Sequence, residues 1–131
     1  MIAVEQIGQS NIVEVIVKGD CTSSDLDQVA RRLNDIIAQQ GTICVLENDR
    51  ATGVVTPMSI LLDESRFDFK NRACITHVAL VTDQLWLGVF SSSLSKMLAA
   101  EVLCFTRLEL KQAKAWLKKK SKNSRSKLLS T

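Results

Sequence analysis

The sequence CTSSDLDQVARRLNDIIAQQGTICVLE, residues 21–47, joins a helix pattern directly to a strand pattern. Thr22 and Asp25 have the spacing of a capping box, and Gly41 is a residue that typically ends a helix. The run TICVLE, residues 42–47, is typical of a strand buried on both faces of a parallel sheet. Apolar residues recur at helical spacing between the two caps, at Leu26, Val29, Leu33, Ile36 and Ile37.

Two strand patterns precede this unit. IAVEQI, residues 2–7, and IVEVIVK, residues 12–18, alternate with a period of two and flank the turn-like GQSN. Such a pair predicts an antiparallel hairpin.

Helix and strand patterns alternate after residue 47. NDRATGVV, residues 48–55, reads as a loop, and Thr56 followed by Pro57 predicts the start of a helix that ends near Arg72. ITHVALV, residues 75–81, reads as the next strand, and Thr82 or Asp83 can cap a helix that follows.

That helix is predicted from Gln84 to about Leu98, and EVLCF, residues 101–105, is the last predicted strand. Thr106 and Glu109 form a second capping-box pattern and open a final helix. Its inward stripe is formed by Leu110, Ala113, Trp116 and Leu117.

The predicted order is therefore β-β-α-β-α-β-α-β-α. This order predicts a single α/β domain with a mixed, mostly parallel sheet flanked by helices. A chain of 131 residues, 46% hydrophobic and 24% charged, is the size and composition of one globular domain. We place the domain at residues 1–118 and predict that residues 119–131 form a basic, disordered tail.

Composition excludes several classes of function. The start of the chain lacks a signal-peptide pattern, and no apolar stretch approaches the ~20 residues that a membrane span needs. We therefore expect a cytoplasmic protein. The four cysteines have no zinc-site spacing and there is one histidine, so no metal and no cofactor are expected. Because strand side chains alternate, His77 should lie on one face of the sheet, opposite Thr76 and Val78, as a sheet residue and not a catalytic base.

Beyond this pattern, the order and spacing of several segments resemble a known family. The segments SRFDFKNRACITHVALVTDQLW, AAEVLCF and QAKAWLK resemble the SpoIIAA-like proteins, a STAS branch also described as STAS/Sec14-like. The resemblance covers roughly residues 1–118. The residues that match the family pattern are Ile75, Val78, Ala79, Val81, Asp83, Trp86, Phe105, Ala113, Trp116 and Leu117.

The resemblance implies a non-catalytic module, because STAS domains bind protein partners, nucleotides or small ligands and Sec14-like relatives bind lipids. Anti-sigma-factor antagonists of this family are phosphorylated on a serine in a D-S-S-G-like motif. This chain has VVTPMS at that place, where Thr56 is the nearest hydroxyl and the one candidate phosphosite. Thr56 also serves as the predicted helix cap.

The candidate ligand site is predicted at the carboxyl end of the 75–81 strand, where open α/β sheets usually bind ligands. The helix that follows is almost uncharged and is apolar around most of its circumference, so it could line a pocket or meet a partner. The predicted lining residues are Met58, Leu61, Leu62, Asp83, Leu85, Trp86, Val89 and Phe90.

A second candidate surface is the basic end of the chain, which has no acidic residue from 118 to 131. Its charges favour contact with an anionic membrane or an acidic partner, and without aromatic residues it has no means of reading nucleic acid specifically. The basic residues are Lys118, Lys119, Lys120, Lys122, Arg125 and Lys127.

Two hypotheses about function follow. The first is a binding domain for a lipid or another hydrophobic small molecule, with transient contact to the inner face of the membrane. The alternative is a protein-interaction or regulatory module, including a homodimer. An enzyme is not expected, because no nucleophile, metal or acid–base constellation is recognisable.

Overall fold

The computed structural model describes residues 2–19, 22–50, 72–83 and 100–129, with side chains as far as Lys122. Five strands form one sheet in the order β1-β2-β3-β4-β5. β1 pairs with β2 antiparallel, and the other three pairings are parallel. The predicted fold class is confirmed. The strands are β1 (Ile2–Gln6), β2 (Ile12–Val17), β3 (Ile43–Asp49), β4 (Ile75–Val81) and β5 (Glu101–Phe105).

The predicted opening hairpin is confirmed. Its turn is closed by the Ile7 amide, which donates to the Ile12 carbonyl at 2.9 Å. Gly8 lies in the turn with a φ of 60°, a backbone conformation that glycine adopts without steric cost. The Ser10 hydroxyl donates to the Ile7 carbonyl and also accepts from the Ile12 amide, which fixes the turn further.

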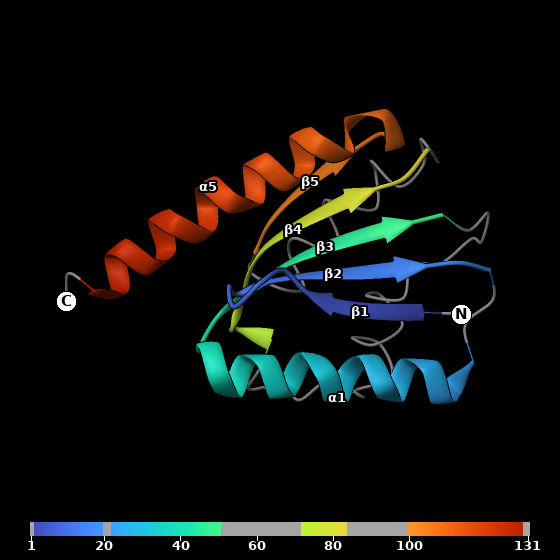
Figure 1. Ribbon diagram of the computed structural model, residues 1–131, viewed down its shortest axis with the longest axis horizontal. Coiled ribbons are helices and arrows are strands. Elements are labelled where there is room, and N and C mark those ends of the chain that lie inside the picture. Colours follow the sequence, from blue (N-terminus) through green and yellow to red (C-terminus); the bar gives the residue numbers. More distant parts are fainter. Residues whose placement is uncertain (1, 20–21, 51–71, 84–99, 130–131) are drawn as a thin grey trace.

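Helix α1 (Ser23–Gln40) covers one face of the sheet (Figure 1). The predicted capping box is present: the Asp25 amide donates to the Thr22 hydroxyl at 3.1 Å, and the Thr22 amide donates to the Asp25 carboxylate at 3.0 Å. The apolar stripe packs on alternate residues of β2, β3 and β4, which form the larger core. Its buried members are Leu26, Val29, Ala30, Leu33, Ile36 and Ile37.

Strand β3 is longer than predicted. Asn48 and Asp49 belong to the strand and not to a loop, because they pair with Ile16 and Val17 of β2. The backbone ladder therefore overrides the turn preference of these two residues. The apolar residues of β3 are buried, as the run predicts, and the polar Glu47, Asn48 and Asp49 are buried as well.

Helix α5 (Leu110–Leu129) covers the opposite face and extends beyond the ends of the strands (Figure 1). It follows the 3-10 turn η1 (Arg107–Glu109), where the predicted Thr106–Glu109 capping box is present. Ala113 and Leu117 are buried, with Leu110 and Trp116 packed beside them. The two helices predicted between β3 and β5 lie outside the described residues.

Helix α5 runs past residue 118, where the sequence analysis places the end of the domain. Helix α5 continues without interruption, because no proline or glycine follows and lysine and arginine are good helix formers. Ser121, placed in the disordered tail by the sequence, is buried, and its hydroxyl donates to the Asn11 side chain. Ser121 of α5 therefore packs against the start of β2 through Asn11.

Candidate functional site

A cluster of polar side chains beneath α5 arises from a β-bulge at the start of β4. The register shifts between Ile43 and Cys44, so that Thr76 is an extra residue between Ile75 and His77. A bulge of this kind changes the direction of side chains. The Thr76 hydroxyl lies 2.9 Å from His77 Nδ1 and 3.6 Å from Cys44 Sγ. The prediction that Thr76 and His77 point to opposite faces is therefore wrong.

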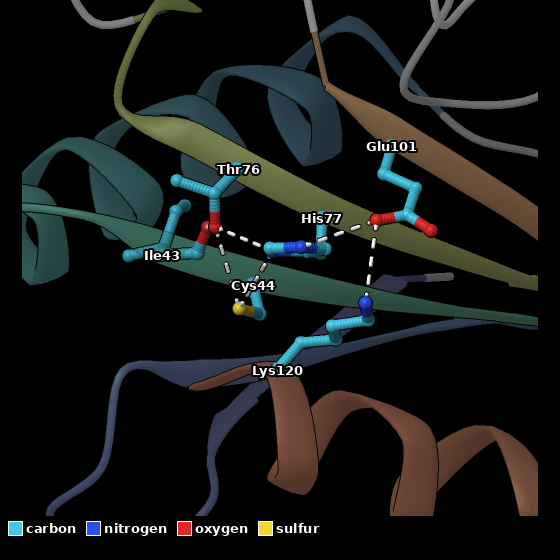
Figure 2. A network of polar contacts seen from close by, with 6 residues as sticks. All are labelled: Ile43, Cys44, Thr76, His77, Glu101 and Lys120. Atoms are coloured by element: carbon cyan, nitrogen blue, oxygen red, sulfur yellow. Dashed lines mark hydrogen bonds and ion pairs between the residues drawn. The ribbon is translucent and has the colours of Figure 1, made fainter. Parts of the chain in front are cut away.

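Figure 2 shows that this network continues from β4 to β5 and α5. His77 Nε2 lies 3.5 Å from the Glu101 carboxylate, and Lys120 Nζ lies 3.7 Å from the same carboxylate oxygen. The Trp116 ring meets the imidazole edge to face at a centroid distance of 5.7 Å. The network therefore joins the middle of α5 to β4 and β5.

Cys44, His77 and Glu101 lie next to one another in the order that a catalytic triad uses, with a nucleophile, a base and an acid that orients the base. Their distances are long, however: Cys44 Sγ is 3.9 Å from His77 Nδ1. Burial raises the pKa of the Cys44 thiol, and burial lowers the pKa of His77 despite the Glu101 carboxylate. Both shifts disfavour a thiolate–imidazolium pair. Among the described residues, no three His, Cys, Asp or Glu side chains are arranged to hold a metal.

A groove lies between α5 and the turn that joins β1 to β2. Its volume is about 640 Å³. Ile7 and Ile12 give it an apolar surface, and Lys118, Lys119 and Lys122 contribute exposed ammonium groups from α5. The remaining lining residues are Gly8, Gln9, Ser10 and Ser121.

A smaller cavity of about 360 Å³ lies at the carboxyl ends of β3 and β4. Asp83, a predicted site residue, is one of its lining residues. Its Oδ1 accepts from the Arg107 amide at 3.1 Å, so this carboxylate caps the turn before α5. The other lining residues, none of which the sequence analysis assigns to a ligand site, are Asn48, Arg50, Arg107, Leu108 and Leu110.

The remaining predicted site residues divide into two groups. Thr56 and the predicted ligand-binding residues other than Asp83 lie outside the described residues. Of the six basic residues, three line the groove and Lys120 turns instead to Glu101. Arg125 and Lys127 belong to α5, but their side chains are outside the described part.

Two properties of the chain bear on membranes and thiols. None of the described helices is long and apolar enough to cross a bilayer. Cys44, Cys74 and Cys104 are in the reduced thiol form, and Cys104 is exposed on β5, although its position in an apolar run favours burial.

Comparison with known proteins supports the fold and the predicted resemblance. One solved structure is an uncharacterised protein from Shewanella loihica with a SpoIIAA-like fold. It has a TM-score of 0.61 and 17% sequence identity, over 89% of this chain and 92% of that chain. None of the curated proteins matches. A family model described as SpoIIAA-like matches residues 12–118, and the chain therefore belongs to the SpoIIAA-like family.

Proposed function

We propose that this chain is a non-catalytic binding domain that takes an anionic membrane lipid in the groove between the β1–β2 turn and α5. The observation that carries the proposal is the combination of an apolar groove with three exposed lysines at its rim. The family is generally non-enzymatic, which agrees with a binding function. The contact would be peripheral, on the inner face of the membrane.

The size and lining of the groove suit a lipid. Its volume of about 640 Å³ is that of a typical small-molecule pocket. Half-buried Ile7 offers apolar surface to an acyl chain, whereas Ile12 lines the groove but is only 3% exposed. Lysine side chains can lie along apolar surface while their ammonium groups reach a phosphate.

The arrangement of charge suits an anionic surface. Lys118 and Lys122 are four residues apart and so lie on one side of α5, with Lys119 beside them. Each base near an anionic membrane contributes about 1 kcal/mol. Three bases are enough for reversible docking, and Arg125 and Lys127 continue the same helix.

Vesicle co-sedimentation tests the proposal. The chain should pellet at low salt with phosphatidylglycerol-containing vesicles and stay in solution with phosphatidylcholine vesicles. The triple variant Lys118→Gln, Lys119→Gln, Lys122→Gln should lose most of this binding, because glutamine keeps the helix but removes the charge. A matched control, Lys111→Gln, Arg31→Gln, Arg32→Gln, removes the same charge from exposed positions outside the groove.

The groove itself needs a second test, because lysines alone could bind any anionic surface. Gln9 is exposed and lines the groove, whereas Gln28 is exposed on α1. Gln9→Glu should weaken vesicle binding, and Gln28→Glu should not. Equal binding by wild type and the lysine triple variant, or by wild type and Gln9→Glu, would contradict the proposal.

That the apolar segment around Trp86 lines a ligand-binding pocket remains a prediction. Native mass spectrometry of the purified chain provides a direct test for a bound lipid. A co-purified lipid that persists in the lysine triple variant but is lost in Trp86→Glu would assign binding to that segment and not to the groove.

Self-association through β5 is the second candidate function. β5 pairs only with β4 among the described strands, and Leu103 is 40% exposed on it. An edge strand with an exposed leucine can pair with a second copy. Light scattering should then show a dimer that dissociates in Leu103→Lys, while a monomer at all concentrations would exclude this function.

A further inference from the structure

We propose a second binding site, independent of the lipid groove, in the cavity at the carboxyl ends of β3 and β4. The site would take a small organic dianion, either a phosphomonoester or a dicarboxylate. Its cationic groups are Arg50, which directly follows β3, and Arg107, which opens η1. Both line the cavity of about 360 Å³.

The backbone on both sides of the cavity is held in place. The Arg50 amide donates to the Val17 carbonyl at 2.9 Å, which extends the β2–β3 ladder by one bond. The Arg107 amide donates to Asp83 at 3.1 Å. Two guanidinium groups on separate, fixed segments can converge on one oxyanion with little loss of backbone entropy on binding.

The charge of the cavity favours a dianion. Two arginines and one aspartate line it, and the described structure records no ion pair for either guanidinium. Guanidinium groups bind carboxylate and phosphate oxygens in a bidentate manner, and two of them match a doubly charged group. Asp83 opposes the anion, and its carboxylate suits a hydroxyl donor on the ligand.

The apolar part of the wall indicates that the ligand carries a carbon skeleton. Leu108 is 99% exposed at the cavity, and Leu110 is half-buried beside it. A bare inorganic ion would leave this leucine in water, whereas an organic group would cover it. We therefore expect phenyl phosphate to bind more tightly than inorganic phosphate.

NMR titration with inorganic phosphate, phenyl phosphate and succinate tests the site. Saturable shifts should centre on residues 48–50, 83 and 107–110. Arg50→Gln and Arg107→Gln should each weaken binding about tenfold, while Arg31→Gln on α1 should have no effect. Asp83→Asn should strengthen binding severalfold, because the amide keeps an acceptor for the Arg107 amide but removes the opposing charge.

The comparison of phenyl phosphate with succinate decides between the two ligand classes. Shifts that never saturate, shifts spread over the lysines of α5, or unchanged affinity in both arginine variants would overturn the site and leave adventitious anion binding only. The lysine triple variant should bind phenyl phosphate like the wild type. The two proposed sites can therefore fail separately.

Discussion

The two faces of the sheet differ in what they bury. The α1 face has the larger apolar core, in which valine, leucine and isoleucine of the sheet meet the helix stripe, and buried Glu47 and Asp49 follow on the same face at the carboxyl end of β3. The α5 face has a smaller apolar cluster and several buried or half-buried polar groups. Asn48 donates to the Glu14 carboxylate at 3.1 Å, Ser121 donates to Asn11, and His77 meets Glu101.

This difference suggests that the α1 face mainly stabilises the fold and that the α5 side also serves binding. Apolar burial stabilises without directional requirements, whereas a buried polar group must keep its hydrogen-bond partner. The groove and the carboxyl-edge cavity are both lined partly by α5 or by the turn before it. We therefore expect substitutions on the α1 face to affect mainly folding, and substitutions around α5 to affect ligands as well.

The largest expected effect is on the α1 face. Leu33 is fully buried, and Leu33→Ala should lower the free energy of unfolding by about 3 kcal/mol, through lost apolar burial and the cavity left behind. Urea denaturation followed by circular dichroism measures this loss. The exposed Gln39→Ala on the same helix should change it by less than about 0.5 kcal/mol.

The contrast between the faces would be disproved if folded Leu33→Ala also lost vesicle binding. The folded fraction of this variant should sediment with anionic vesicles as the wild type does. The measurement must therefore be made below the denaturation temperature of the variant.

The α1 face could be predicted from the sequence because its signals are local. Thr22, Asp25 and Gly41 define both ends of the helix, and the apolar spacing defines its buried side. The hairpin is equally local, since GQSN lies between two alternating strands. These elements required no knowledge of distant contacts.

The α5 face could be predicted only in part, because its polar clusters depend on distant pairings. The alternation rule fails at Thr76 and His77, since the bulge exists only through the register of β4 on β3. The groove likewise brings together Ile7 and Lys118, which are far apart in the sequence. Arg50 and Arg107 had a usable signal, because each follows a parallel strand closely and such ends meet at one edge of the sheet.

The second effect tests a buried polar pair on the α5 face. Ser121→Ala removes the hydroxyl that donates to Asn11 and leaves the Asn11 oxygen without that bond. The free energy of unfolding should fall by about 1–2 kcal/mol in urea denaturation. Ser24→Ala, at an exposed position of α1, is the matched control. A loss no greater than that of the control would show that residues beyond 118 do not belong to the packed domain.

A smaller effect is expected for the ion pair that joins α5 to β5. Lys120 lies 3.7 Å from Glu101, but the Glu101 side chain is 50% exposed. Solvent screens such a pair, so Lys120→Gln should cost about 0.5 kcal/mol or less in the same denaturation experiment. A cost above that of Ser121→Ala would reverse the ranking of buried and exposed polar contacts on this face.

The smallest effect should be visible only as a dependence of stability on pH. Burial lowers the pKa of His77 below 6.5, and the Glu101 carboxylate offsets part of this shift. The unfolded chain therefore binds a proton at a higher pH than the folded chain does. Stability should be complete above about pH 7 and should fall as the pH drops through 6.5 toward the folded-state pKa.

His77→Gln should remove this slope between about pH 5 and 7, because His77 is the only histidine and carboxylates titrate mostly at lower pH. Glu101→Gln should make the slope steeper, since the neutral amide no longer favours the imidazolium. Glu5→Gln, an exposed change on β1, should leave it unchanged. Stability that instead rose on acidification in the wild type would mean that the Glu101 carboxylate outweighs burial, and that the half-buried imidazole is charged beneath α5.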